Sequence, residues 1–501
     1  MNLGANSHPY LPTRMDSPTD HEVIHSTIPA RLDALPWSRW HWRVVIALGI
    51  TWILDGLEVT IVGSLGAVLQ RPDTLALSGA DIGWTGSSYI AGAVLGALYF
   101  GRKADRLGRK RLFLITLAVY VAATVLTAFS FNFWSFAACR FLTGVGIGGE
   151  YAAINSAIDE LIPARVRGQV DLAINGSFWL GAALGAGLSL LLLDPALLGP
   201  QLGWRLAFGL GALLGVAILL IRRYVPESPR WLITHGQVER AEAEFADIES
   251  EIVAEHGPLP LVTHSLDVVR RPAPSWREIG EVLFLRYRRR AILGFALMVS
   301  QAFFYNAIFF TYALVLTDFY KVPETRVGLY ILPFAVGNLL GPLVLGHFFD
   351  TLGRRVMISC TYTLSALGLL ATGYAFTQNW LTAGTQTLCW SAIFFVASAA
   401  ASSAYLTVSE IFPLEMRAVA ISVFYAIGTA AGGFLAPALF GALIASQNRE
   451  AVFGGYILGA ALMLGAAVVA AIFGVDAERK SLEEVAEPLS AVHSDEQIES
   501  T

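Results

Sequence analysis

The sequence predicts an all-α membrane protein of twelve spanning helices in two pseudo-symmetric six-helix bundles. The chain has 501 residues, of which 55% are hydrophobic and only 15% charged, whereas soluble domains contain about 25% charged residues. Apolar segments of roughly 20 residues, the length needed to cross a bilayer, recur along the chain. Two charged motifs also occur once in each half, at offsets of 245 and 250 residues.

The first 42 residues form a mainly polar segment with five prolines and no signal-peptide pattern, so we expect a cytoplasmic tail over 1–42. We expect the N-terminal bundle over 43–222, with spans at 43–69, 82–101, 112–130, 133–158, 170–193 and 204–222. The C-terminal bundle is expected over 290–475, with spans at 290–317, 327–349, 356–376, 381–408, 418–445 and 451–474.

The segment between the bundles, 223–289, is expected to be a central cytoplasmic loop. Within it, Gln237–His256 alternates apolar and charged residues at helical spacing, which predicts a surface helix, although a mobile solvated linker is the alternative. Residues 476–501 are expected to form an acidic cytoplasmic tail.

The distribution of Lys and Arg predicts the orientation, because short cytoplasmic loops carry the excess of these residues. With the N-terminus inside, the short cytoplasmic loops hold 11 Lys and Arg and the opposite loops hold 5. We therefore expect a multi-pass protein of the cytoplasmic (inner) membrane with both termini in the cytoplasm.

The composition excludes several other classes of protein. The 34 basic and 39 acidic residues nearly balance and form no basic stripe, so no nucleic-acid partner is expected. Cys139, Cys360 and Cys389 all lie in apolar runs, which argues against disulfides or a metal site. No nucleophile and base lie on adjacent helices, so we expect no catalytic residues, no enzyme activity and no cofactor. The expected partners are the lipid bilayer and a small-molecule substrate, and we expect a monomer.

The charged motifs carry a family resemblance. Gly101-Arg-Lys-Ala-Asp105-Arg-Leu-Gly-Arg109 returns as Gly346-His-Phe-Phe-Asp350-Thr-Leu-Gly-Arg354, and Glu160-Leu-Ile-Pro-Ala-Arg-Val-Arg167 returns as Glu410-Ile-Phe-Pro-Leu-Glu-Met-Arg417. Repeats of this kind are typical of secondary transporters, whose substrate site lies between the repeats near the membrane midplane. Together with Pro226-Glu-Ser-Pro-Arg-Trp-Leu232 and Arg140…Gly144-Val-Gly-Ile-Gly-Gly-Glu150, the pattern resembles the sugar-porter-like branch of the major facilitator superfamily.

A second resemblance lies in the first span. Asp55-Gly-Leu-Glu58 is similar to the signature of the aromatic-acid/proton symporters, with leucine and glutamate at the third and fourth positions. These resemblances imply alternating-access transport of a small organic solute, with proton-coupled symport of a sugar-like or organic-acid substrate, including aromatic acids. The alternatives are a facilitative uniporter, a drug/proton antiporter and, from a different class, a transporter-like membrane sensor.

Ionisable residues inside spans are functional candidates because they are costly to insert into a membrane. Asp55 and Glu58 share one face of the first span, and Arg140 of the fourth span is expected at the same depth as Glu58. The resemblance implies that Glu58 binds and releases the coupling proton and that Arg140 tunes its affinity, with a permanent structural ion pair as the alternative. The proton is the expected coupling ion.

Two further sets of residues are predicted. Charged residues at the cytoplasmic ends are expected to form gating salt bridges that break as the transporter opens inward: Asp105, Arg106, Arg109, Glu150, Glu160, Arg167, Asp350, Arg354, Glu410 and Arg417. Polar and aromatic residues at mid-depth are candidates for binding the substrate, or for interhelical hydrogen bonds: Asn175, Trp179, Gln301, Tyr305, Asn306, Asn338, Trp390, Tyr405 and Tyr425.

Overall fold

The computed structural model describes residues 23–222, 225–309 and 311–492, and these are almost entirely helical. The first bundle contains α2 (Arg39–Ser64), α3 (Gly66–Leu69), α4 (Gly79–Leu107), α5 (Arg109–Ala128), α6 (Phe133–Leu161), α7 (Arg167–Gly176), α8 (Phe178–Leu192) and α9 (Pro195–Arg222). The second contains α13 (Arg288–Phe309), α14 (Tyr312–Tyr320), α15 (Glu324–Thr351), α16 (Arg354–Thr377), α17 (Ala383–Glu410), α18 (Arg417–Thr429), α19 (Leu435–Ala445) and α20 (Arg449–Phe473).

Ten segments of the described residues are long and apolar enough to cross a membrane. The other two predicted spans correspond to α4 and α6, which are 29 residues long each and run past the predicted ends into the charged motifs. The chain therefore has the twelve-helix architecture that the sequence predicts, in two bundles of six spans.

Local sequence signals start several of these helices. Ser78 and Asp81 at α4, and Thr382 and Thr385 at α17, form capping boxes in which each side chain accepts a hydrogen bond from the other residue's backbone N–H. Asn132 similarly accepts from the N–H of Ser135 at α6. The polar residues between the apolar runs thus determine where these spans begin.

Within the described residues, four spans that the sequence predicts as continuous are interrupted, and the first of them divides into α2 and α3 at Leu65. The fifth divides into α7 and α8 at Ser177, the seventh into α13 and α14 near Thr311, and the eleventh contains a π-helical turn, Ala430–Phe434, between α18 and α19. Interrupted helices are characteristic of transporter substrate sites, since they allow backbone and side chains to face a cavity.

A layer of short elements covers one end of the molecule, which we call the capped end. It contains β1 (Val23–Ser26), α1 (Ile28–Ala34), α10 (Pro229–Thr234), α11 (Val238–His256), β2 (Leu266–Val269), α12 (Trp276–Glu281) and α21 (Leu482–Val485). Strands β1 and β2 pair antiparallel, with Val23 opposite Val269. Helix α11 forms where a surface helix is predicted, and its Ala241, Phe245, Ile248 and Ile252 are buried on one face.

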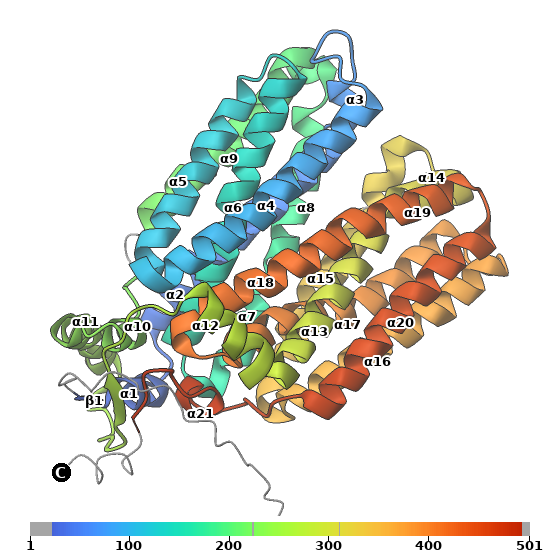
Figure 1. The fold of residues 1–501 in the computed structure, drawn as a ribbon. Helices are drawn as coiled ribbons and strands as arrows, with labels where there is room; N and C mark the ends of the chain where they lie inside the picture. Colours follow the sequence, from blue (N-terminus) through green and yellow to red (C-terminus); the bar gives the residue numbers. More distant parts are fainter. Residues whose placement is uncertain (1–22, 223–224, 310, 493–501) are drawn as a thin grey trace, which may run out of the picture.

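The two bundles meet at the capped end and diverge toward the opposite end (Figure 1). Helices α4 and α18, and α7 and α15, make the main contacts between the bundles. Glycines permit the close approach of helices: a Cβ on Gly168 of α7 would collide with the guanidinium of Arg354 from the other bundle. The bundles are thus closed against each other at the capped end.

Candidate functional site

A cavity of about 190 Å³ lies between the bundles, and both bundles line it. Its walls contain aromatic rings, amides and hydroxyls, and none of its lining residues is ionisable at neutral pH: Trp52, Tyr151, Asn175, Phe178, Trp179, Gln301, Tyr305, Asn306, Phe309, Ser398, Ala401, Ser402 and Tyr405. These residues come from α2, α6, α7, α8, α13 and α17, so three of the interrupted spans, the first, fifth and seventh, face the cavity.

Six of the nine substrate-binding candidates line this cavity: Asn175, Trp179, Gln301, Tyr305, Asn306 and Tyr405. The other three lie outside its lining. Asn338 is buried behind the wall and accepts a hydrogen bond from the hydroxyl of Tyr305 at 2.8 Å. Trp390 is buried against Tyr312 and Tyr456, and Tyr425 packs edge-on against Tyr151, with ring centroids 4.9 Å apart.

Several lining residues were not among the sequence candidates, Trp52 and Tyr151 above all. Their rings stack with centroids 4.6 Å apart and an interplanar angle of 17°. A spacing signal exists for both: Trp52 lies one turn before Asp55, and Tyr151 lies three turns after Arg140, hence on the same helical face. Phe178, Phe309, Ser398 and Ser402 carry no such signal.

The predicted ion pair between the first and fourth spans is present. Arg140 donates to Glu58, which also accepts a hydrogen bond from the hydroxyl of Tyr120. Both partners are buried, with side chains 3% and 5% exposed. Asp55 is not bonded to Arg140; it accepts instead from Tyr151 and, at 3.3 Å, from Tyr89.

These contacts connect the ion pair with the cavity. The guanidinium of Arg140 lies 4.5 Å from the ring centroid of Tyr89, and Tyr89 and Tyr151 both hydrogen-bond Asp55. Tyr151 in turn lines the cavity. This buried site thus contains two carboxyl groups and one guanidinium, which bonds Glu58 and not Asp55, and uncompensated charge in such a site is costly. Taking up one proton makes this set of three groups electrically neutral.

Glu150 is part of a different ion pair from the one predicted. It pairs with Arg222 at 2.8 Å, inside the first bundle, and the guanidinium of Arg222 lies 4.4 Å from the ring centroid of Phe113. Glu150 lies ten residues before Glu160 on α6, or about 15 Å along the axis, which puts it too far from the helix ends to gate them. The prediction that Glu150 forms a gating bridge is therefore wrong.

The gating set contains a reciprocal pair of caps at the capped end. Asp105 of the first bundle accepts from the backbone N–H groups of Ala418 and Val419, at 3.2 and 3.0 Å, where α18 begins. Asp350 of the second bundle accepts from those of Gly168 and Gln169, at 3.0 and 2.7 Å, where α7 begins. Each carboxylate meets the positive end of a helix in the other bundle, the favourable arrangement for an anion.

Four arginines and two glutamates surround these caps. Arg109 pairs with Glu160 at 2.8 Å and Arg354 with Glu410 at 3.0 Å, each within one bundle. Across the bundles, Arg417 approaches Glu160 and Arg167 approaches Glu410, each at 3.7 Å. All six side chains are at most 2% exposed. The predicted residues Asp105, Arg109, Glu160, Arg167, Asp350, Arg354, Glu410 and Arg417 therefore form one buried layer.

Arg106 does not belong to this layer. Its side chain is exposed and makes no ion pair or hydrogen bond within the described residues. The reason is helical geometry, because Asp105 points toward α18 and the next residue points about 100° away. The prediction of a gating salt bridge for Arg106 is thus wrong.

The motif Pro226–Leu232 contributes two charged residues at the capped end that were not among the predicted gating residues. Arg230 of α10 binds Asp33 at 2.7 Å and Glu483 at 2.5 Å, and so joins segments from the two ends of the chain. Burial alone would lower the pKa of Arg230, but the two carboxylates outweigh it and the pKa is raised. Glu227 accepts from the N–H groups of Arg109 and Lys110 where α5 begins, and burial raises its pKa.

The chain is similar over most of its length to known transporters. The family described as "Sugar (and other) transporter" matches residues 38–489. A niacin transporter of Acinetobacter baylyi is 27% identical over 91% of this chain and 99% of its own length. A 4-hydroxybenzoate transporter of Pseudomonas aeruginosa is 25% identical over 91% and 98% of the two chains.

Solved structures share the fold. A proton:xylose symporter bound to 6-bromo-6-deoxy-D-glucose superposes with a TM-score of 0.72 and 20% sequence identity, covering 89% of this chain and 98% of the symporter. The same xylose transporter from E. coli, in a partially occluded inward-open conformation, gives a lower TM-score of 0.63. These relatives and neighbours are transporters and not enzymes.

Proposed function

This chain belongs to the sugar (and other) transporter family of the major facilitator superfamily, and we propose that it is a proton-coupled symporter of a small ring-shaped solute. The observation that carries the proposal is the continuous set of contacts from the cavity through Tyr151, Asp55 and Tyr89 to Arg140 and Glu58. Through these contacts, a substrate bound in the cavity can affect the protonation of the ion pair.

In the proposed cycle, Glu58 carries the proton. Protonation neutralises Glu58 and so weakens its ion pair with Arg140, which joins the first and fourth spans. Asp55 is then the remaining carboxylate near the guanidinium. Substrate that contacts Trp52 and Tyr151 changes the packing of the ring that hydrogen-bonds Asp55. The proton and the substrate thus act on the same small cluster, which is what coupling requires.

We place the capped end in the cytoplasm, with both termini there and the protein a monomer in the cytoplasmic membrane. The excess of Lys and Arg in the loops at this end supports the placement. In this orientation the reciprocal caps of Asp105 and Asp350 close the cytoplasmic side. They must break for the substrate to leave inward.

The cavity favours a single ring that carries polar groups. Aromatic rings supply stacking surfaces and Asn175, Gln301 and Asn306 supply amides for hydroxyl or carboxyl groups. Its volume of about 190 Å³ is below the roughly 300 Å³ at which drug-sized pockets begin. Niacin and 4-hydroxybenzoate, named for two relatives, and xylose, named for a structural neighbour, all have one ring. The proposed substrate is a molecule of this kind, sugar-like or an aromatic acid.

Proton uptake into proteoliposomes tests the proposal. Niacin, 4-hydroxybenzoate, xylose and myo-inositol are added in turn while internal pH is followed. Each is tested with the wild type, with Glu58→Gln, and with Glu450→Gln, a control in which the acid is exposed at the far end of the molecule. We expect one compound class to drive proton uptake in the wild type and the control and not in Glu58→Gln.

Two outcomes contradict the proposal. If labelled compound equilibrates without proton movement, and equally well in Glu58→Gln, the protein is a facilitative uniporter and the ion pair is structural. If the compound drives proton movement in the opposite direction, the protein is an antiporter. Monodisperse elution of each variant verifies that the loss of Glu58 has not unfolded the chain.

A further inference from the structure

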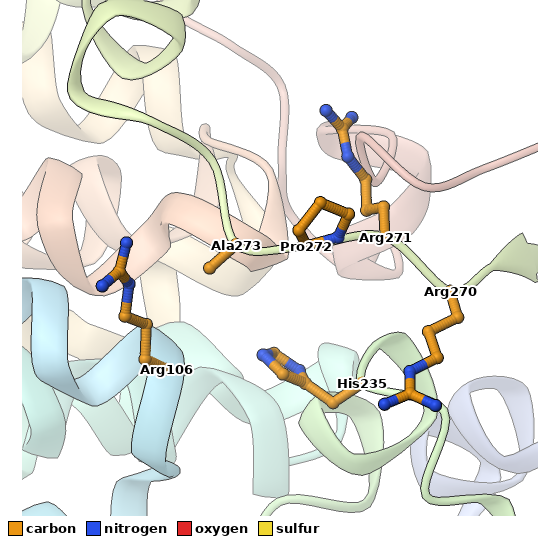
Figure 2. Close-up of a pocket in the computed structure, with 6 residues that line it drawn as sticks. All are labelled: Arg106, His235, Arg270, Arg271, Pro272 and Ala273. Atoms are coloured by element: carbon orange, nitrogen blue, oxygen red, sulfur yellow. The ribbon is translucent and has the colours of Figure 1, made fainter. Parts of the chain in front are cut away.

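A second pocket of about 520 Å³ lies at the capped end and is lined by basic residues with no acidic residue among them. Arg106 comes from the last turn of α4, His235 from the end of α10, and Arg270, Arg271, Pro272 and Ala273 from the segment after β2. Figure 2 shows Arg106 and Arg270 on opposite sides of the pocket, with His235 between them.

The three arginines of this pocket differ in whether they already have a partner. Arg271 is neutralised by Glu278 and also donates to the carbonyl of Leu489 at 2.8 Å, and its guanidinium turns away from the pocket (Figure 2). Arg106 and Arg270 have no ion pair or hydrogen bond among the residues that the structure describes. In a layer where Arg109, Arg167, Arg230, Arg354 and Arg417 are all paired, these two leave two positive charges facing one hollow.

The pocket is also structurally fixed. The stem of Arg270 lies across Gly236, whose φ is +71°; a Cβ there would approach the Arg270 Cδ to 2.9 Å. Pro272 and Pro274 stiffen the segment that follows. His235 stacks on Trp231 with ring centroids 4.1 Å apart, its Nδ1 hydrogen-bonds the Trp231 carbonyl at 2.9 Å, and the ring also hydrogen-bonds the backbone of Asp105. The walls are therefore preorganised, which lowers the cost of binding.

We propose that this pocket binds a phosphate monoester, an anion of about two negative charges that matches Arg106 and Arg270. Arginine is the residue that recognises phosphate best, because its planar fork of N–H groups fits the phosphate oxygens. The pocket is far larger than inorganic phosphate requires, so its volume holds the organic part of the ester. A soluble phosphorylated metabolite and the headgroup of a phosphatidic acid both present this chemistry.

Binding there would strengthen closure of the capped end. Arg106 belongs to the first bundle. The segment of Arg270 is tied, through Arg271 and the N–H of Val269, to Leu489 and Ser490, which Glu415 of the second bundle holds by hydrogen bonds of 2.6–3.0 Å. An anion that contacts both arginines thus links the bundles on the side where Asp105 and Asp350 already join them.

The test measures binding with two arms that separate the sources of phosphate. The soluble arm titrates sn-glycerol 3-phosphate into detergent-purified full-length protein and follows microscale thermophoresis, with sulfate at equal ionic strength as the comparison anion. The lipid arm compares nanodiscs of phosphatidylcholine with and without 10 mol% phosphatidic acid and counts retained phosphatidic acid by native mass spectrometry. Each arm uses wild type, Arg106→Gln, Arg270→Gln, and the control Arg277→Gln, whose side chain is 89% exposed nearby on α12.

We expect the monoester to bind the wild type and Arg277→Gln in at least one arm. Each substitution in the pocket should weaken binding by about tenfold or more, since each removes charge-assisted hydrogen bonds. Arg270→Lys, which keeps the charge, should retain part of the affinity and shows that loss in Arg270→Gln does not reflect misfolding. Binding that is equal in all variants, binding of sulfate as tight as that of the monoester, or no binding in either arm overturns the proposal.

Discussion

Asp350→Ala should open the capped end. The side chain of Asp350 is 3% exposed, and it accepts two hydrogen bonds across the bundle interface, from the N–H groups of Gly168 and Gln169 at 3.0 and 2.7 Å. Its third contact, with Arg354 at 2.8 Å, lies within its own bundle and persists when the bundles separate. Of the contacts of Asp350, only the two bonds to α7 are therefore expected to break when the bundles separate.

The magnitude follows from those two bonds. A hydrogen bond to a charged group contributes about 1.5 kcal/mol at the low end of its range, so two contribute about 3 kcal/mol to the closed state. At about 1.4 kcal/mol per factor of ten, the equilibrium between closed and open should shift toward open by roughly two orders of magnitude. A protein that is almost wholly closed at this end would then populate both states measurably.

Double electron–electron resonance provides the assay. Spin labels at Leu107→Cys and Leu352→Cys, exposed positions at the capped end of the first and second bundles, report the separation there after the three native cysteines are replaced. The control is Asp81→Ala, because Asp81 also caps a helix with its carboxylate, at 2.8–2.9 Å from Ser78, but within one bundle. A longer distance population in Asp350→Ala and not in Asp81→Ala is expected. An unchanged distribution would refute the assignment of the caps as the closing device.

Three other changes give distinct readouts. Tyr151→Phe keeps the ring that stacks on Trp52 but removes the hydroxyl that hydrogen-bonds Asp55, so proton flux per substrate in proteoliposomes should fall while substrate counterflow persists; unaltered stoichiometry argues against Tyr151 as the link. Arg222→Met leaves the buried Glu150 without its ion-pair partner and should lower the stability of the folded protein by about 3–5 kcal/mol. The double variant Glu150→Leu/Arg222→Met should recover most of that stability, as measured by thermal unfolding. Burial lowers the pKa of His235 from its usual 6.5. As the pH drops through 6.5, His235 is therefore protonated in the unfolded chain before it is protonated in the folded chain, and the free energy of unfolding falls. His235→Phe should flatten that loss in melts between pH 5 and 7.5, and the exposed His264→Phe should leave it unchanged.

The sequence predicts the fold well because bilayer physics leaves few options. Each span must hydrogen-bond its own backbone, so apolar runs of the right length become helices wherever they occur. The repeated motifs then place Asp105 with Asp350 and Glu160 with Glu410 at one end. The breaks within the fifth, seventh and eleventh spans escaped prediction, since Ser177 and Thr311 fit a continuous apolar helix as well as an interrupted one.

The site was predicted less completely, because the sequence does not give the direction in which each side chain points. Spacing along a helix gives depth and face, which is enough to bring Glu58 to Arg140 and Gln301 to the cavity. It does not say how a helix is rotated against its neighbours. Trp390 and Asn338 lie at the predicted depth but outside the lining of the cavity. Glu150 pairs with Arg222 instead of a gating residue, and Arg106 makes no ion pair among the described residues; only the packed structure reveals these outcomes.

The two halves share the reciprocal caps and differ at the proposed proton site. At the position in the tenth span that corresponds to Arg140 in the fourth, the second half has Trp390, 1% exposed and 4.8 Å from the ring centroid of Tyr312. An aromatic cluster is neutral at every physiological pH, so its packing does not respond to protons, whereas the cluster of Glu58, Arg140 and Asp55 changes its net charge with each one. The caps of Asp105 and Asp350 are reciprocal, since each bundle supplies one carboxylate and one helix start to the other. In the proposed symport the proton site lies in the first bundle alone, so proton binding changes the internal charge of that bundle and leaves the internal charge of the second bundle unchanged.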